Sequence, residues 1–293
     1  MPTSPERDIA GIKDLVEDTE ATWKRIREHA LEPEVAELAA LGYTVIPPEK
    51  VGPMSDIVEA REAILALAEK EGAAKSNYTT YQEGLSYELY HLVKQGRIFE
   101  KLLVNPAILA LGRYLLGERM ILNNSLAYVK TRTDKHLAIH SDTLMVPDPL
   151  PDYLHLVNFS IVLTDYSLQA GCIGIVPGSH RCRRHPTTPE ERYFDVMRPI
   201  ECPAGSVIVI PGNTWHGAFP KRDDGFRVTL VQAYSRQYLA PSVTHRIDPA
   251  IIARNSPEFA RLLGGNLWTG FDEKGLDLEK FGSTYRSQRS VYA

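Results

Sequence analysis

The chain has 293 residues, of which 43% are hydrophobic and 24% charged, with a formal net charge of −4 at pH 7. This mildly acidic balance argues against a partner that is nucleic acid or an anionic membrane surface. No apolar run approaches the roughly 20 residues that a membrane-spanning helix needs. The composition is typical of a globular protein with enough apolar material for a sizeable core.

Three cysteines, Cys172, Cys182 and Cys202, form an odd set without a Cys-x-x-Cys pair. This pattern argues against a disulfide framework and against a thiolate zinc site. The N-terminal segment is polar and acidic, unlike a secretory signal, and the C-terminal SVYA is no peroxisomal address. We therefore expect reduced thiols in a cytoplasmic protein.

The first part of the chain has a helical pattern. Helices are predicted from Pro5 to Leu41 and from Met54 to Glu71, where charged and apolar residues alternate at helical spacing. Shorter helices are predicted from Leu85 to Val93 and from Pro106 to Leu116. Between the first two helices, GYTVIP at 42–47 predicts a short strand.

From Met120 the pattern changes to short β-rich runs bounded by Gly, Pro, Asp or Asn. The predicted strands are MILNNSLAYVK at 120–130, LHLVNFSIVL at 154–163, CIGIVP at 172–177, SVIVIP at 206–211 and FRVTLVQAY at 226–234. A helical pattern returns only near 249–263. Closely spaced strands that do not alternate with helices favour a sandwich or jelly roll over a parallel α/β sheet.

No repeat, low-complexity tract or Pro/Ser-rich linker marks a domain boundary. We expect a single domain over residues 1–293, mainly β with flanking α-helices. It would have a helical N-terminal part at about 1–118, a β core at about 119–240 and a C-terminal helical extension at about 241–293.

His140 and Asp142 stand two residues apart in the β-rich half. Residues i and i+2 of a strand point to the same face, so this imidazole and carboxylate would converge on one point. His216 is the best-placed third ligand, because it follows a predicted strand and a Pro-Gly-Asn turn. Two histidines and a carboxylate that leave the other face of a metal open suit an iron(II) oxygenase. A His-x-Asp triplet alone is weak support, since hydrogen-bonded strand histidines are common.

Arg227 lies on the apolar strand at 226–234, eleven residues beyond His216. A 2-oxoglutarate molecule that chelates iron at one end presents a second carboxylate at the other end. A guanidinium grips such a carboxylate with two parallel hydrogen bonds, which a lysine cannot do. Thr229, on the same face of the strand, would donate its hydroxyl to the same group. The alternative is a solvent-exposed strand arginine.

The segment from His140 to Arg227 resembles the phytanoyl-CoA dioxygenase-like family of iron(II)/2-oxoglutarate oxygenases. The resemblance is carried by LGYTVIP at 41–47, HSD at 140–142, AGCIGIVPGSH at 170–180, AGSVIVIPGNTWHGAFP at 204–220 and FRVTLVQAYSRQY at 226–238. It implies a double-stranded β-helix core of the jelly-roll or cupin-like type. It also implies that His140, Asp142 and His216 bind Fe(II) and that Arg227 binds 2-oxoglutarate. A substrate C–H bond is then oxidised with O2, with loss of CO2 and formation of succinate.

Two positions depart from the family pattern. Many relatives have a glutamine three residues before the first metal histidine, where this chain has Leu137. The position two residues after the last ligand, often a serine, is Ala218. We expect Asn123 or Ser125, on the strand at 120–130, to contact the co-substrate in place of that glutamine.

Thr143, Met145, Trp215 and Phe219 neighbour the metal ligands in the sequence and are predicted to face the substrate cavity. Their largely apolar character favours a hydrophobic small molecule, and the resembling family is common in specialised metabolism. The alternative is an anionic substrate held by the basic run RCRRH at 181–185.

Two other functions remain open at this point. One is a cupin-like divalent-metal hydrolase or isomerase without 2-oxoglutarate, against which Arg227 argues. The other is a non-catalytic binding protein of the same fold, which the intact triad disfavours. Asp142 argues against halogenation, because a halide would need the position of that carboxylate. Hydroxylation, desaturation, cyclisation and endoperoxide formation start from the same substrate radical, so the outcome stays open, as do the substrate and the oligomeric state.

Overall fold

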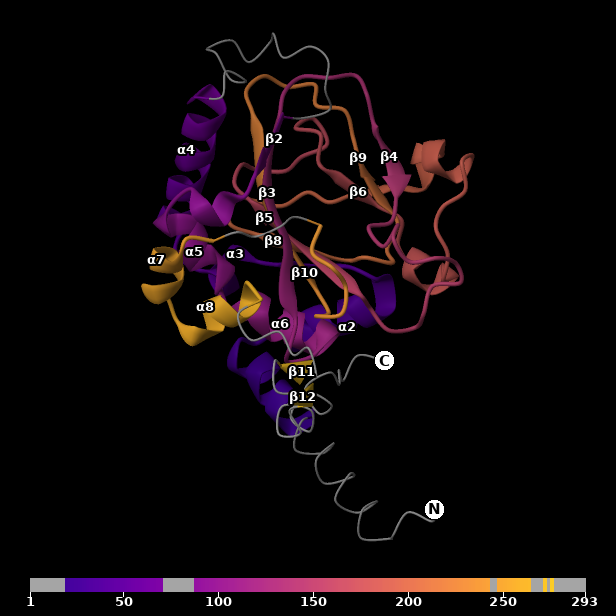
Figure 1. Cartoon of the computed structure of the whole chain (residues 1–293). Coiled ribbons are helices and arrows are strands. Elements are labelled where there is room, and N and C mark those ends of the chain that lie inside the picture. The colour runs from indigo at the N-terminus through magenta and orange to yellow at the C-terminus, as the bar shows by residue number, and fades with distance from the viewer. Residues whose placement is uncertain (1–18, 71–86, 243–246, 265–270, 273–274, 277–293) are drawn as a thin grey trace, which may run out of the picture.

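The protein is described by a computed structural model that covers residues 19–70, 87–242, 247–264, 271–272 and 275–276 (Figure 1). Two antiparallel sheets form its centre. The major sheet has the order β1 (Thr44–Ile46), β8 (Val207–Pro211), β5 (Leu156–Val162), β10 (Arg227–Ser235), β3 (Ile121–Lys130) and β2 (Tyr87–Tyr90). The minor sheet has the order β4 (Leu137–His140), β9 (His216–Ala218), β6 (Ile173–Ile175) and β7 (Arg198–Pro199). Strands β11 (Phe271–Asp272) and β12 (Gly275–Leu276) form a separate pair.

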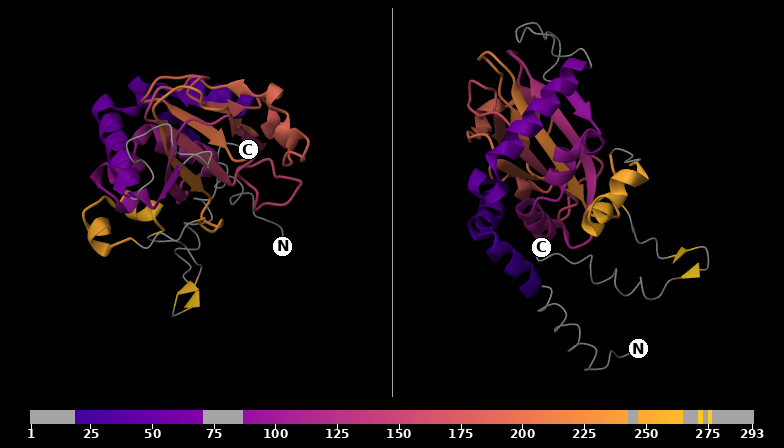
Figure 2. Two further views of the ribbon diagram at one scale, coloured as in Figure 1. Left: turned by 90° about the horizontal axis from the view of Figure 1, so that it is seen from above. Right: turned by 90° about the vertical axis from the view of Figure 1, so that its left-hand side faces the viewer.

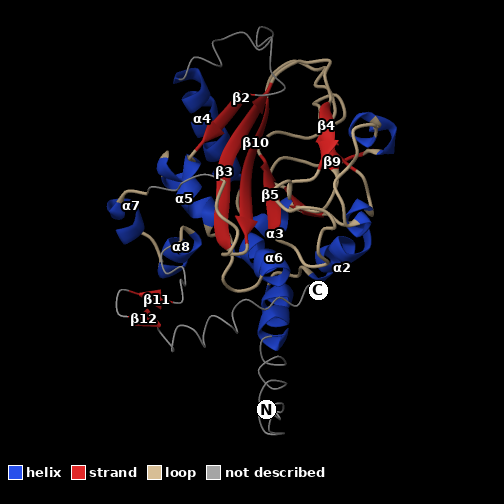
Figure 3. Ribbon diagram, turned by 45° about the vertical axis from the view of Figure 1, so that its right-hand side comes forward, coloured by secondary structure: helices blue, strands red, loops and turns tan. Residues whose placement is uncertain are grey.

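Helices cover the outer face of the major sheet (Figures 2 and 3). Residues 19–28 are helical. The labelled α-helices are α2 (Glu32–Leu41), α3 (Pro48–Val51), α4 (Met54–Lys70), α5 (Arg97–Leu103), α6 (Pro106–Leu116), α7 (Pro249–Ala253) and α8 (Pro257–Leu262). Short 3-10 helices are η1 (Leu92–Lys94), η2 (Ser179–Cys182), η3 (Glu190–Arg192) and η4 (Phe194–Val196). The main core lies between these helices and the sheet, where Ile64 of α4 and Leu111 of α6 pack in one cluster with Phe159 of β5. None of the described helices is long and apolar enough to cross a bilayer.

Strand β10 shows how one sheet serves both a core and a cavity. Val228 and Leu230 join the helix-covered core, whereas Arg227, Thr229 and Val231 line a cavity of about 500 Å³. Successive side chains of a strand point to opposite faces, so the period of two separates these roles. Residues of both sheets line the cavity, which therefore lies between the sheets.

Most of the predicted elements are confirmed. The five β-rich runs contain β3, β5, β6, β8 and β10, and the motif at 42–47 contains β1. The helices predicted from Met54 and from Pro106 are α4 and α6. The long N-terminal helix is interrupted, because the chain turns at 29–30 before α2 begins, and Ala30 adopts a φ of 50°. The predicted part before residue 19 lies outside the described residues.

The helix predicted from Leu85 to Val93 is wrong. Within its described part, Tyr87–Tyr90 is the edge strand β2, followed by the 3-10 helix η1. Tyr87 pairs with Val129 and Tyr90 with Leu126, so hydrogen bonds to β3 override the local helical preference. Strands β1 and β2 thus extend a sheet whose other strands all come from the predicted β core.

Candidate active site

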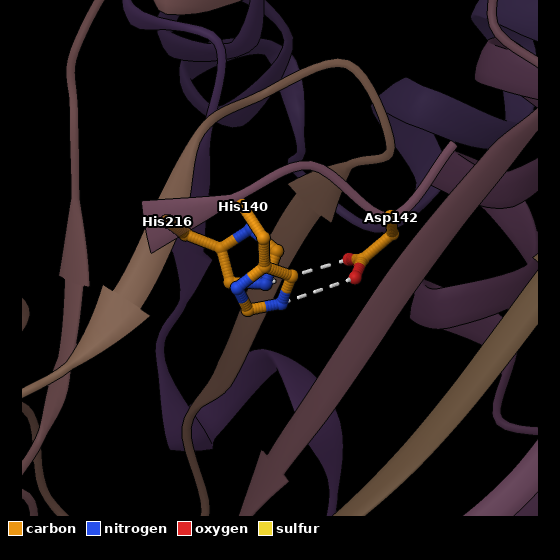
Figure 4. Close-up of side chains that lie close together, drawn as sticks. All are labelled: His140, Asp142 and His216. Atoms are coloured by element: carbon orange, nitrogen blue, oxygen red, sulfur yellow. Dashed lines mark ion pairs between the residues drawn. The ribbon is translucent and has the colours of Figure 1, made fainter. Parts of the chain in front are cut away.

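His140 and His216 lie side by side on neighbouring strands of the minor sheet. His140 ends β4 and His216 begins β9, and the two are register partners with ring centroids 4.3 Å apart. Asp142 follows just after β4, where its backbone N–H donates to the Gly212 carbonyl at 2.9 Å. Gly212 belongs to the turn between β8 and β9, so the same turn holds Asp142 and leads to His216. Figure 4 shows the three side chains pointing toward one another.

The three side chains offer ligand atoms around one point. His140 Nε2 lies 3.5 Å from Asp142 Oδ1, and His216 Nε2 lies 3.4 Å from Asp142 Oδ2. The three ligand atoms lie within 4.8 Å of one another, and this is the one such cluster among the described residues. Such spacing fits three atoms that each bind a single first-row metal ion at about 2.0–2.2 Å.

Hydrogen bonds orient all three side chains. His140 Nδ1 lies 2.9 Å from the Ala138 carbonyl and His216 Nδ1 lies 3.1 Å from the Thr214 carbonyl. A carbonyl only accepts, so each Nδ1 carries the proton and each Nε2 presents its lone pair to the site. Asn158 Nδ2 donates to Asp142 Oδ2 at 2.6 Å, leaving Oδ1 free of that bond.

The protonation states also suit a metal. Burial lowers the pKa of His216, which favours the neutral imidazole. Burial also opposes the charged form of His140, but the hydrogen bond and charge of Asp142 raise the pKa of His140 overall. Burial alone would raise the pKa of Asp142, but the nearby His216 and His140 and the Asn158 hydrogen bond lower it overall. The cluster therefore combines a neutral imidazole with an ionised carboxylate, the donors that a divalent iron ion requires.

The cavity lining contains a buried guanidinium. Arg227 is only 6% exposed, and its guanidinium carbon lies 4.9 Å from the centre of the Tyr166 ring. Its Nη1 donates to the Gly171 carbonyl, while its Nε has no hydrogen-bond partner among the described residues. Thr229 lies beside it and shares a hydrogen bond with the Tyr166 hydroxyl. A buried cation with an unpaired N–H beside a cavity fits a carboxylate-bearing ligand.

The sequence profile of the phytanoyl-CoA dioxygenase (PhyH) family matches residues 40–229, more than half of the chain. The chain belongs to the phytanoyl-CoA dioxygenase family. The prediction of an iron(II)/2-oxoglutarate-dependent dioxygenase is thereby confirmed, and this PhyH-family member is an enzyme of that class.

Two curated relatives of this PhyH-family chain are dioxygenases. The dioxygenase af480 of Aspergillus fumigatus is 26% identical over 300 residues, covering 99% of this chain and 90% of the relative. The ectoine dioxygenase of Stutzerimonas stutzeri is 26% identical over 250 residues, covering 72% of this chain and 80% of the relative.

Solved structures confirm the double-stranded β-helix fold. HygX from Streptomyces hygroscopicus, with nickel and 2-oxoglutarate bound, has a TM-score of 0.58 at 16% identity, covering 72% of this chain and 88% of HygX. SnoK, the non-haem carbocyclase from nogalamycin biosynthesis, has a TM-score of 0.56 at 22% identity, covering 77% of this chain and 91% of SnoK. At these identities the likeness shows the fold.

Asn123 and Ser125 lie away from Arg227, at the other end of β3. The register between β3 and β10 shifts after the pair Asn124–Ala233, so a bulge breaks the simple alternation. Asn123 lines the cavity, but it bonds to Ser242 and the Ala240 carbonyl. Ser125 is buried and is not among the residues that line the cavity.

The four predicted substrate residues also lie outside the cavity lining. Thr143 donates to the Gly212 carbonyl at 3.1 Å, and Met145 is 88% exposed. The indole N–H of Trp215 donates to the Arg184 carbonyl at 2.9 Å, and Phe219 packs beside Trp215 in a small satellite core. Immediate neighbours of a strand residue point away from its face, so nearness in sequence to a ligand does not bring a side chain into the cavity.

The arginines of the basic run at 181–185 contact residues that do not line the cavity. Arg181 donates to the Ala39 carbonyl at 2.8 Å, and Arg183 pairs with Asp152 at 3.1 Å. Arg184 makes two hydrogen bonds to Glu190. None of these arginines lines the cavity, so the described residues do not favour the anionic-substrate alternative.

Among the lining residues that the sequence reasoning missed are Asn124, Lys130 and Asn158 of the major sheet, and Tyr166, which follows β5. Three of them lie on β3 and β5, in phase with other lining residues such as Leu126 and Ser160. A period-two count along those strands, starting from the cavity face, would have pointed to them.

Proposed function

We propose that this enzyme oxidises a C–H bond of a small molecule at an Fe(II) ion held by His140, Asp142 and His216. The co-substrate 2-oxoglutarate would be held by Arg227, assisted by Thr229. When bound, iron with 2-oxoglutarate and O2 supplies the oxidising chemistry and yields succinate and CO2. The observation that carries the proposal is the His–Asp–His cluster in one cavity with a buried arginine whose Nε has no partner in the described part.

The chain's own residues prepare this site before any ligand arrives. The backbone carbonyls behind each histidine hold the rings with Nε2 turned inward. Asn158 fixes the Asp142 carboxylate, and the Tyr166 ring supports the guanidinium of Arg227. Such preorganisation avoids reordering the ligands when the metal and co-substrate bind.

The cavity wall supports a largely apolar substrate with a hydrogen-bond donor. Leu126, Val231 and Ile210 supply apolar surface, and Ala233 leaves space between Asn124 and Asn158, its partners on either side. The Asn124 Oδ1 is buried with no hydrogen-bond partner among the described residues. A substrate hydroxyl or N–H would satisfy it, because a buried unpaired acceptor is costly.

A specialised metabolite is the substrate class that the comparisons support. SnoK is named for nogalamycin biosynthesis, and HygX has been solved with hygromycin B bound. We further propose that residues 1–293 act as one oxygenase domain in the cytoplasm. In support, strands β1 and β2 from the N-terminal part complete the major sheet, and all three cysteines are free.

The test is aerobic incubation with Fe(II), 2-oxoglutarate and a panel of alcohol- and amine-bearing apolar metabolites, following succinate and substrate mass together. We expect succinate formation coupled to a mass change of one panel member, and no coupled product with His216→Ala. Metal-dependent turnover that proceeds without 2-oxoglutarate would instead identify a cupin-like hydrolase or isomerase. Against that alternative function, the buried Arg227 would have no ligand.

A further inference from the structure

Lys130 is a second buried cation in the cavity lining. It is the last residue of β3 and the direct register partner of Arg227, the first residue of β10. Both side chains line the cavity, and Lys130 is only 2% exposed. Directly opposed residues of antiparallel strands have Cβ atoms about 4.5–5.5 Å apart, so two cationic side chains begin side by side.

No acid in the described part of the chain forms an ion pair with either cation. Lys130 Nζ donates to the Phe219 carbonyl at 2.6 Å, and Arg227 donates to the Gly171 carbonyl. Both acceptors are neutral. Buried charges in proteins are usually paired with an opposite charge. Lys130 and Arg227 lack such a negative partner among the described residues.

The other titratable groups around Lys130 do not supply that partner. Lys221, in the chain after β9, is itself a cation and already pairs with Asp223. Burial raises the pKa of the Cys172 thiol, just before β6, to about 11, so this group is neutral near pH 7. His136, before β4, contributes no negative charge.

Two lining residues of the minor sheet are apolar. Leu137 of β4 and Ala218 of β9 are register partners, and both line the cavity. An anion in this region would therefore depend on β3 and β10 for its charged contacts.

We propose that Lys130 is the second anchor of the co-substrate site. Together with Arg227 it binds the distal carboxylate of 2-oxoglutarate, and it takes up one proton from solvent when that carboxylate binds. This inference rests on the proposed function, because it assumes that 2-oxoglutarate enters this cavity.

The proton uptake has a direct physical cause. Burial, followed by repulsion from Arg227, lowers the pKa of Lys130 to about 7, so much of the free enzyme holds a neutral amine at neutral pH. An arginine does not lose its proton in a protein, so Lys130 is the one of the two that becomes neutral. A bound carboxylate restores the ammonium form and raises the pKa again, so binding takes up a proton above about pH 7.

The sign of the pH dependence follows. As pH rises through the pKa of the free enzyme, a growing fraction of Lys130 must be protonated on binding, and the affinity for 2-oxoglutarate falls. For one proton the dissociation constant rises by up to about tenfold per pH unit above pH 7. If Lys130 served only to hold the Phe219 carbonyl against β3, it would contribute to stability. Binding of 2-oxoglutarate would then not show this pH dependence.

The experiment is anaerobic calorimetric titration of the iron-loaded enzyme with 2-oxoglutarate, from pH 6.5 to 8.5, in buffers of different ionisation enthalpy. We expect about half a proton taken up at pH 7 and nearly one at pH 8. Lys130→Met should abolish that uptake and weaken binding about tenfold or more at pH 7. Lys130→Arg should bind 2-oxoglutarate without proton uptake. The control is Lys50→Met, since Lys50 already pairs with Glu34 at 2.6 Å and does not line the cavity.

Each outcome decides between distinct statements. Wild-type binding without proton uptake overturns the inference, even if Lys130→Met fails to fold. The inference is also overturned if folded Lys130→Met enzyme binds 2-oxoglutarate with unchanged affinity and unchanged proton uptake. If that variant then shows only a lowered melting temperature, the role of Lys130 is structural. Wild-type enzyme that binds iron but no 2-oxoglutarate at any pH refutes the proposed function instead.

Discussion

Asn158 donates a hydrogen bond to Asp142 across 2.6 Å, from β5 of the major sheet to the segment that follows β4 of the minor sheet. This bond joins the two sheets at the proposed metal site. It also sets which carboxylate oxygen remains for a metal ion, since Oδ2 is already engaged.

The first prediction concerns that bond. Asn158→Ala should lower iron affinity about 10- to 100-fold, because partners behind metal ligands typically contribute that much. Iron affinity is measured by competition with a chelator. The matched control is Asn255→Ala, which removes a half-buried amide bonded to Glu100, outside the cavity. Equal iron affinity in the Asn158 variant and the wild type would show that Asp142 is oriented by its backbone alone.

The second prediction concerns Arg227. Arg227→Lys keeps a positive charge but loses the planar pair of donors, so the dissociation constant for 2-oxoglutarate should rise while iron affinity stays nearly constant. Loss of a buried charge-assisted contact corresponds to about 2–5 kcal/mol. Anaerobic titration of the iron-loaded enzyme measures this effect. If Arg227→Ala binds 2-oxoglutarate as well as the wild type, the distal carboxylate is held elsewhere.

The third prediction concerns the substrate chamber. Ala233→Leu should fill the space between Asn124 and Asn158, and so suppress substrate-stimulated succinate formation. Slow 2-oxoglutarate consumption without substrate should persist, because the iron and co-substrate positions are untouched. Met145→Ala should leave both rates unchanged, since Met145 is 88% exposed. If Met145→Ala suppressed substrate-stimulated succinate formation and Ala233→Leu did not, the substrate would bind at the outer surface instead.

The fourth prediction concerns stability. Gly42 caps α2 with a φ of 82°, and a Cβ there would lie 2.2 Å from His180 Nδ1. Gly225 has a similar φ of 83° but open space around it. Gly225→Ala should therefore cost only the backbone strain, about 1–2 kcal/mol, and Gly42→Ala clearly more. Denaturant unfolding measures both free energies.

An iron measurement extends the same comparison. The Gly42 carbonyl accepts a hydrogen bond from the Thr214 hydroxyl at 2.6 Å, two residues before His216. Gly42→Ala should therefore also weaken iron binding, whereas Gly225→Ala should not. Equal unfolding losses and equal iron affinities in the two variants would contradict a steric effect at Gly42.

The sequence alone was enough to predict β1, β3, β5, β6, β8 and β10, the family and the three candidate ligands. Those predictions depend on local periodicity and on short motifs, and both are properties of neighbouring residues. The spacing of His140 and Asp142 predicts a shared face, and Arg227 is conspicuous because it lies on an apolar strand. Helix Met54–Lys70 likewise carries its own apolar stripe.

Tertiary structure alone decided which other side chains reach the cavity. A bulge in β3 breaks the alternation beside Asn123, and pairing with β3 turns Tyr87–Tyr90 into a strand instead of a helix. The pairing of Lys130 with Arg227 joins residues 97 positions apart, so no local pattern contains it. Register between distant strands results from the packing of the whole sheet, and that packing determines which charges lie buried together.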